Sequence, residues 1–462
     1  MAKKIVEILL LILIILIGNN ARSASYATVP QPGENSDEYA YAWAGLTLLT
    51  QGKPEAWTHF PDAYKNAKKE KVNVDHIFEK NPDFPEFTIV SPWFDNPPAT
   101  GLITGGYAYL KGFRSLEEVS VITIRRPMLG IAILTTALLY VFASLVFNKK
   151  TGMLAAFLYS IIPSIVISSR LALAENFMAP LFLLTAIFAL LYLKSRDNKY
   201  WILACLIGSF SILFKISAVA IPLALFLIAL KYGRNEKPNL LKRLFLSFSF
   251  AFIVYLLYGL VLGFDEFVQL AVQQSQRFYG ASSEAFYQAF TQAKITKTLT
   301  DGWLNMAWVS ALIVSFKHFR KNRFRFINII FIFSYLVVFL IFGSEAYGHY
   351  RIPFYPFLIL SAAYVLMDVF QRPNIFLFLT LMLLPFGTTL HRLIGVMEFQ
   401  KYVSLFRYGI LCAFFTYMLF LVRPKIGVWF VRLFMIMIFI LTVYLSIKEI
   451  YFFNIDKWYF AT

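Results

Sequence analysis

Long apolar runs alternate with short polar connections along most of this chain. After Lys3 and Lys4 an apolar run covers residues 5–17, and about twelve more follow from residue 127, many of them approaching the ~20 residues that a helix needs to span a bilayer. The pattern predicts an all-α polytopic membrane protein with about 13 transmembrane helices. The later runs are 127–147, 151–168, 173–193, 200–214, 216–232, 244–263, 303–316, 327–342, 352–370, 374–390, 405–422 and 426–447.

Residues 26–118 contain no run long enough to cross a membrane and hold most of the polar sequence. The run before them is short enough for the core of a signal peptide. Whether it is cleaved or kept as an anchor, the chain then emerges outside the cytoplasm, and we expect it to be kept because the later spans then form a consistent ladder. The polar segment is thus predicted to be a large first external loop, in which Asp37–Gln51 forms a short helix along the membrane surface, closed by Gly52.

Composition and charge agree with a membrane protein. Hydrophobic residues make up 59% of the chain and charged residues 15%, against about a quarter charged in soluble domains. The net charge of +17 could suggest nucleic acid, but the basic clusters lie between apolar runs, as cytoplasmic loops do. We therefore expect membrane lipids and no nucleic acid as partners, and no disulfide framework from Cys205 and Cys412. The expected inside connections are 148–150, 194–199, 233–243, 317–326, 371–373 and 423–425.

These observations divide the chain into four parts. Residues 1–25 are the first transmembrane helix or signal anchor, 26–118 the first extracytoplasmic loop, 119–447 the multi-helix membrane domain and 448–462 a short external tail. The long connection 264–302 is expected to be partly mobile or helical. A plasma membrane is the default location, because no retention signal ends the sequence.

Carboxylates on the expected external side are the first candidates for chemistry. Asp37 and Glu38 begin the short helix, where acidic side chains also simply complement a helix dipole. A carboxylate there could instead take a proton from an acceptor hydroxyl. Glu175 lies just inside an apolar run, where a charge is costly unless it is paired or faces a polar cavity. Arg170 could merely neutralise it.

Cations on the same side are candidates for binding a phosphate. His349, Tyr350 and Arg351 precede the run at 352–370 and offer donors and positive charge, although such residues are also ordinary interface anchors. Lys215 lies between two runs on the external side, where the positive-inside rule gives it no role. The remaining external cations are expected to be snorkelling or solvated; they are Arg125, Arg126, Arg277, Arg392 and Arg407.

Four short motifs lie on the expected external side: Asp37-Glu38-Tyr39, Phe94-Asp-Asn-Pro-Pro, Arg170 through Glu175, and His349-Tyr-Arg-Ile-Pro-Phe-Tyr-Pro. No zinc cluster, nucleotide-binding loop or Ser-His-Asp arrangement is visible beside them. Together the four motifs resemble the lipid-linked sugar transferases of the C-type glycosyltransferase fold, especially the protein O-mannosyltransferase and lipid A aminoarabinose transferase branch. The resemblance covers most of the chain.

The resemblance implies transfer of a sugar from a polyprenyl-phosphate carrier to an acceptor on the external face, usually with inversion. Asp37 would be the base or the residue that orients the acceptor, and Glu38 and Glu175 would shape the site. His349, Tyr350, Arg351 and Lys215 would hold the departing phosphate, whose developing charge fixed cations stabilise. Asn96 stands where the family often has His or Lys, which puts a phosphate contact there in doubt.

Several points stay open at the level of sequence. The acceptor could be a protein, a lipid or a polysaccharide. No cofactor is implied with certainty, although two or three nearby carboxylates would be able to bind a divalent cation. An oligosaccharyltransferase would carry a large soluble carboxyl-terminal domain, and only a short tail follows the last run. The alternative function is a transporter or flippase of lipid-linked sugars, which would normally show internal repeats and broken helices near the middle of the bilayer.

Overall fold

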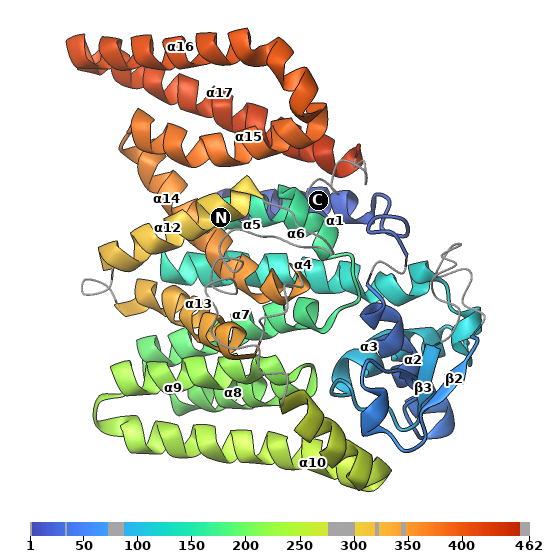
Figure 1. Cartoon of the computed structure of the whole chain (residues 1–462). Coiled ribbons are helices and arrows are strands. Elements are labelled where there is room, and N and C mark those ends of the chain that lie inside the picture. Colours follow the sequence, from blue (N-terminus) through green and yellow to red (C-terminus); the bar gives the residue numbers. More distant parts are fainter. Residues whose placement is uncertain are drawn as a thin grey trace.

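The computed structural model is a bundle of helices with a smaller lobe at one end (Figure 1). It describes residues 2–32, 35–72, 87–275, 301–318, 323–342 and 348–452. The bundle helices are α1 (Ala2–Ser23), α4 (Val121–Val146), α5 (Lys149–Ile161), α6 (Pro163–Ser168), α7 (Ala174–Ser195), α8 (Asn198–Phe210), α9 (Ala220–Tyr232), α10 (Lys237–Ser275), α12 (Gly302–His318), α13 (Arg323–Phe342), α14 (Tyr355–Gln371), α15 (Ile375–Phe399), α16 (Val403–Val422) and α17 (Pro424–Tyr451).

The apolar runs of the sequence form the helices of the bundle, as expected. Within the described residues, eight helices are long and apolar enough to cross a membrane, and three apolar helices are shorter. This supports a predominantly helical polytopic membrane protein, whereas the expected count of about 13 spans is not established. The run at 151–168 is broken at Pro163 into α5 and α6, because proline cannot continue a helix hydrogen-bond ladder.

The connections that carry basic residues lie at one end of the bundle, where their lysines form polar contacts with neighbouring helices. Lys149 Nζ donates to Glu7 Oε2, near the start of α1, at 2.7 Å. Lys194 donates to the carbonyl of Leu145, and Lys317 pairs with Asp368. At the opposite end of α1, Asn20 donates to the Tyr451 hydroxyl at the end of α17. The bundle thus has two chemically distinct ends, the arrangement that alternating inside and outside connections require.

The lobe lies between α1 and α4 in the sequence and contains α2 (Asp37–Gln51) and α3 (Ala99–Leu110). Helix α2 has the bounds expected from the sequence and ends at Gly52, whose φ of 75° favours glycine. Most of its residues are buried within the protein, and its expected position along the membrane surface stays a prediction. Gly45 packs so closely against α3 that an added Cβ would collide with the backbone of Gly101.

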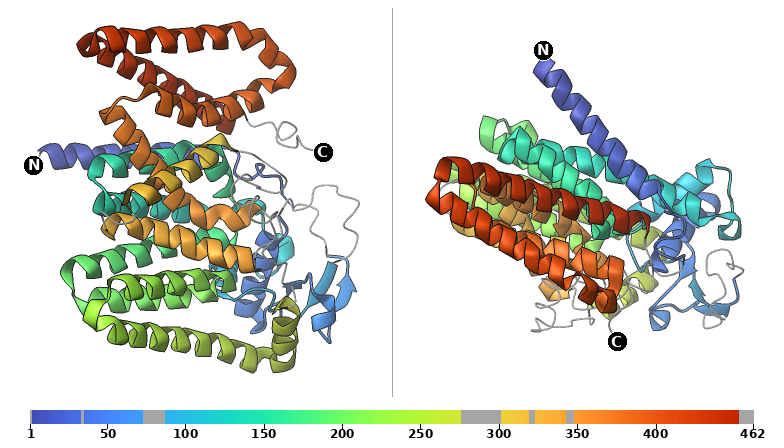
Figure 2. Two further views of the ribbon diagram at one scale, coloured as in Figure 1. Left: turned by 60° about the vertical axis from the view of Figure 1, so that its left-hand side comes forward. Right: turned by 90° about the horizontal axis from the view of Figure 1, so that it is seen from above.

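A small sheet completes the lobe and was not expected from the sequence. Strands β1 (Ala56–Trp57), β3 (Phe87–Val90) and β2 (Lys68–Glu70) lie in the order β1-β3-β2, and both pairings are antiparallel. Two views of the bundle show the lobe at the same end (Figure 2). Of the expected loop at 264–302, residues 264–275 continue α10, which is interrupted by a non-helical Gly263, and 276–300 lie outside the described residues. The expected tail at 448–462 lies mostly outside them too.

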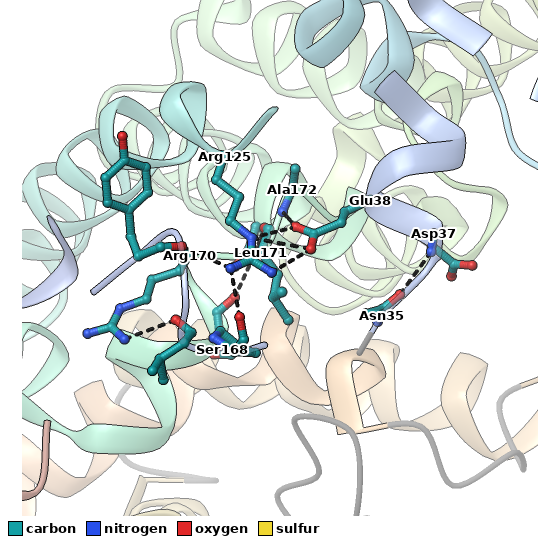
Figure 3. A network of polar contacts seen from close by, with 12 residues as sticks. Asn35, Asp37, Glu38, Arg125, Ser168, Arg170, Leu171 and Ala172 are labelled. Atoms are coloured by element: carbon teal, nitrogen blue, oxygen red, sulfur yellow. Dashed lines mark hydrogen bonds and ion pairs between the residues drawn. The ribbon is translucent and has the colours of Figure 1, made fainter. Parts of the chain in front are cut away.

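A buried ion pair joins the lobe to the bundle (Figure 3). Arg125 of α4 donates to both carboxylate oxygens of Glu38, with Nη2 2.6 Å from Oε1 and Nε 2.9 Å from Oε2. The amide of Ala172 also donates to Glu38, and Arg125 donates to the carbonyls of Tyr26 and Pro30. Both side chains are fully buried. The expectation that Arg125 is solvated or snorkelling is therefore wrong.

Two further arginines bind the end of α1 and the segment after it to the turn between α6 and α7. Arg170 donates to the carbonyls of Val29 and Ala21, at 3.0 and 2.9 Å. Arg22 donates to Ser169 Oγ at 2.9 Å. Arg170 therefore donates to backbone carbonyls. The interpretation of the sequence in which it neutralises Glu175 is wrong.

Removing the charge of Glu38 should destabilise the junction between lobe and bundle. Glu38→Gln leaves the buried guanidinium of Arg125 without a counterion, and breaking such a pair costs about 3–5 kcal/mol. We expect a clear fall in the Tm of the purified protein, followed by thermal unfolding in detergent. The exposed Glu117→Gln is the matched control and should leave Tm unchanged. An equal Tm for Glu38→Gln and wild type would contradict this role.

Candidate active site

The first turn of α2 sends its two carboxylates in different directions. Figure 3 shows Glu38 pointing to Arg125 and Ala172, whereas Asp37 points away from them. Asn35 accepts a hydrogen bond from the Asp37 amide through Oδ1 at 3.2 Å. The Asp37 carboxylate lies 3.5 Å from His59 Nε2, and its side chain remains 29% exposed. The Glu38 carboxylate is thus used in the ion pair with Arg125, whereas the Asp37 carboxylate is partly exposed at the edge of the lobe and can contact a ligand.

Asp37 is ionised over the whole physiological pH range. Burial alone would raise the pKa of this carboxyl, but the hydrogen bond from His59 and the positive charges of His349, His59 and Lys215 outweigh it and lower the pKa to about 2. A carboxylate of such low basicity holds a proton poorly in the ligand-free protein. It is suited to orient a hydroxyl and to take its proton only as a bond to that oxygen forms.

A second group of charges lies beside the first turn of α2. Asn35 Nδ2 is 3.2 Å from His349 Nδ1, a contact between residues 314 positions apart. His349 Nε2 is in turn 3.9 Å from Glu175 Oε1. His349 comes from the 3₁₀ helix η6 (Gly348–Phe354) and Glu175 from the first turn of α7. The fold therefore brings the acids at 37 and 175 together around one histidine.

Lys215 is the counterion of Glu175. Its ammonium group bonds Glu175 Oε1 and lies 4.3 Å from the centre of the Tyr350 ring, a cation–π contact. Burial would lower the pKa of this lysine, but the negative charge of Glu175, the nearby Tyr350 and the hydrogen bond to Glu175 raise it. Lys215 therefore stays protonated within the cluster. Its odd position under the positive-inside rule was the signal that marked it in the sequence.

Arg351 has a different environment. Its side chain is buried, and its guanidinium carbon lies 5.9 Å from the centre of the Phe339 ring. Within the described residues, none of its three side-chain nitrogens has a hydrogen-bond partner. Buried guanidinium groups are normally paired, because desolvating an uncompensated charge is expensive. The arrangement has the character of a site for an anion that the described residues do not supply.

Asp95 accepts a hydrogen bond from the backbone of His59 and so fixes its position. From the sequence, this residue was named only as part of the motif Phe94-Asp-Asn-Pro-Pro. The carboxylate accepts from Thr58 Oγ1 at 2.8 Å, from the His59 amide at 3.1 Å and from the Tyr64 hydroxyl at 2.7 Å. Burial raises its pKa to about 6, against the effect of these hydrogen bonds. Its neighbour Asn96, a candidate phosphate ligand that the sequence left in doubt, forms no hydrogen bond within the described residues. His59 was missed because a single histidine in a polar loop carries no pattern.

The carboxylates near the cluster do not fit a divalent cation. Asp37 faces His59, Glu38 is bound by Arg125, and Glu175 is bound by Lys215. The part of the chain that the structure describes holds no group of three or more His, Cys, Asp or Glu residues arranged for a metal ion. Because a hard cation needs several converging oxygen ligands, we assign no step to one.

The structure thus places most of the predicted site residues together. Asp37, Glu175, Lys215, His349 and Tyr350 are joined by the contacts above, and Arg351 adjoins them in η6. Glu38 adjoins the cluster but faces the junction between lobe and bundle. The chemical roles expected of these side chains remain predictions.

Comparison with known proteins connects this geometry to one fold. Residues 95–259 match the family described as dolichyl-phosphate-mannose-protein mannosyltransferase. ArnT from Cupriavidus metallidurans, solved with bound undecaprenyl phosphate, is similar with a TM-score of 0.56 at 15% identity, over 96% of this chain and 77% of that one. The oligosaccharyltransferase AglB from Archaeoglobus fulgidus, solved with an inhibitory peptide and a dolichol-phosphate, gives 0.54 at 13%, over 97% and 56%. No curated protein sequence matches the chain significantly.

The family match runs from the end of the lobe through α4 to α9 and into α10, and so includes Arg125, Glu175 and Lys215. The structural similarity to ArnT extends over 96% of the chain. The chain is therefore a membrane protein of the C-type glycosyltransferase fold, as the resemblance of its sequence implied.

Proposed function

We propose that this protein is a glycosyltransferase that moves a sugar from a polyprenyl-phosphate carrier to an acceptor hydroxyl, with inversion at the anomeric carbon. The observation that carries the proposal is the buried Arg351 guanidinium, which has no hydrogen-bond partner within the described residues and lies at the same end of the bundle as Asp37. An arginine binds a phosphate through two parallel hydrogen bonds. The carrier phosphate is the anion that would complete this site.

The chemistry follows from the two sides of the cluster. The acceptor hydroxyl attacks the anomeric carbon from the side of Asp37, which orients it and takes its proton as the new bond forms. The bond from the anomeric carbon to the phosphate oxygen breaks, and the phosphate leaves as an anion against Arg351, with Lys215 and His349 nearby. Fixed cations aimed at the developing charge lower the barrier without reorganisation.

The site belongs, in this proposal, on the extracytoplasmic face of a plasma membrane. Support comes from the two ends of the bundle: the basic connections meet at the end opposite the lobe, and basic connections favour the cytoplasm. The carrier lipid would reach η6 from the bilayer, and the acceptor would approach the exposed edge of Asp37 from the aqueous side. Its identity as protein, lipid or polysaccharide stays open.

Replacing Arg351 should weaken binding of the carrier. Arg351→Ala removes the proposed phosphate ligand, and we expect the Kd for undecaprenyl phosphate to rise at least about tenfold, the loss of a charge-assisted hydrogen bond. Binding is measured with the purified protein in nanodiscs. Arg126→Ala removes an exposed arginine at the same end of the bundle and serves as control. Unchanged affinity in Arg351→Ala would remove Arg351 from the phosphate site.

Replacing Asp37 should stop turnover without preventing binding. Asp37→Asn keeps the shape of the side chain but cannot take a proton, so we expect kcat to fall about 10²- to 10⁴-fold. The Kd for undecaprenyl phosphate should stay within about twofold, since the carboxylate faces the acceptor. Asp62→Asn changes an exposed acid of the same lobe and should remain active. Normal turnover by Asp37→Asn would overturn the assignment.

The pH dependence should reveal the role of His59. With its pKa lowered to about 2, Asp37 contributes no acid limb to kcat/KM between about pH 4 and 8. His59→Gln removes the largest influence that lowers this pKa, so an acid limb should move upward toward the measured range. His391→Gln, an exposed histidine of α15, should leave the profile as in wild type. Identical profiles for His59→Gln and wild type would contradict the pairing.

A further inference from the structure

Two buried polar atoms beside the catalytic cluster have no use in the chemistry above. One is the Tyr41 hydroxyl, on α2 one turn after Asp37, and the other is Glu175 Oε2, the carboxylate oxygen that does not accept from Lys215. Both side chains are at most 1% exposed. Neither atom has a hydrogen-bond partner within the described residues. Leaving such atoms unsatisfied costs on the order of 1–3 kcal/mol each.

The two atoms belong to neighbouring elements at one end of the bundle. Residues four apart on a helix share a face, so Tyr41 lies on the face of Asp37. The start of α2 is docked onto the turn before α7 by the hydrogen bond from the Ala172 amide to Glu38, and Glu175 follows in the first turn of α7. Among charged groups, Glu175 has the largest effect on Tyr41, and with burial it raises the pKa of this phenol well above its usual value. The hydroxyl therefore keeps its proton and acts as a donor.

Packing holds the Tyr41 ring in a fixed position. Its ring meets Trp93 edge to face, with centroids 6.0 Å apart. The backbone carbonyl of Tyr41 faces Gly101 of α3, where an added Cβ would approach to 2.7 Å. A rigid ring with an unsatisfied hydroxyl is unlike an ordinary core tyrosine, whose hydroxyl normally finds a partner when it is buried.

We propose that Tyr41 and Glu175 form a subsite for the sugar of the donor, in which a neutral ring hydroxyl accepts from Tyr41 Oη and donates to Glu175 Oε2. A hydroxyl is the group that both donates and accepts, so it satisfies a lone donor and a lone acceptor together. This inference rests on the proposed function. It gives the sugar a recognition element separate from the phosphate contact at Arg351 and from the acceptor side of Asp37.

The test compares binding of a bare and a sugar-bearing carrier. The full chain in nanodiscs is titrated with undecaprenyl phosphate alone and with undecaprenyl phosphates carrying mannose, glucose or galactose. We expect at least one of these sugars to improve the Kd of wild type about tenfold over the bare carrier, which corresponds to one or two hydrogen bonds to a buried site. Tyr41→Phe and Glu175→Gln should each lose most of this gain.

The bare carrier and a matched variant separate the outcomes. Tyr41→Phe should bind undecaprenyl phosphate as wild type does, and Tyr258→Phe, which removes a hydroxyl next to Phe94 outside the cluster, should keep the full gain from the sugar. If wild type does not bind the bare carrier, the proposed function fails. If it does, but no neutral sugar improves binding or Tyr41→Phe keeps the gain, the subsite alone is wrong. An equal loss for both lipids would move Tyr41 to the phosphate.

Stability gives a second, independent measurement. Because the Tyr41 hydroxyl has no hydrogen-bond partner among the described residues, its removal should leave the Tm of the ligand-free protein unchanged or higher, as happens when a binding site carries unsatisfied groups. A lower Tm for Tyr41→Phe would mean that the hydroxyl stabilises the protein itself, which overturns its assignment to a ligand. Glu175→Gln is not suited to this measurement, because it also breaks the ion pair with Lys215.

Discussion

Compensation of buried charge is the constraint on which this structure depends. At the junction between lobe and bundle, ionised side chains are withdrawn from water, and each must find a partner or destabilise the fold. Glu38 and Arg125 satisfy one another and thereby fix where α2 begins relative to α4. Asp37, the preceding residue, points away from this contact and faces His59. The position of the candidate catalytic carboxylate is thus a consequence of the ion pair next to it.

In the cluster most buried charges are also paired, but a few polar groups are not. Lys215 compensates Glu175, and His59 faces Asp37. What remains without a partner within the described residues is a guanidinium on one side and a phenol and one carboxylate oxygen on the other. A positive group suits a phosphate, and a donor beside an acceptor suits a hydroxyl. A sugar phosphate offers both kinds of group in one molecule, which is why the proposed donor and the proposed subsite fit together.

Sequence patterns predicted the parts of this fold that depend on local or one-dimensional information. Apolar runs located the bundle helices, and the acidic first turn with a following glycine gave α2 its bounds. Lys215 was recognised because it lies on the expected external side, whereas the positive-inside rule places loop lysines on the cytoplasmic side. The sheet was not predicted, because β1 has two residues and β2, Lys68–Glu70, is wholly exposed and shows no alternation. The partners of buried charges could not be predicted either, because Arg125 and Glu38 lie 87 positions apart and no periodicity of the sequence connects them. His59 and Tyr41 acquire meaning only from what the fold places beside them.

The most direct test of this account is a structure of the protein in nanodiscs with undecaprenyl phosphate bound, determined by electron cryomicroscopy. The account predicts that the phosphate lies within hydrogen-bond distance of the Arg351 guanidinium, on the side of the cluster away from Asp37. A phosphate bound at the other end of the bundle, or an Arg351 side chain that pairs with a protein carboxylate while the lipid binds elsewhere, would contradict it.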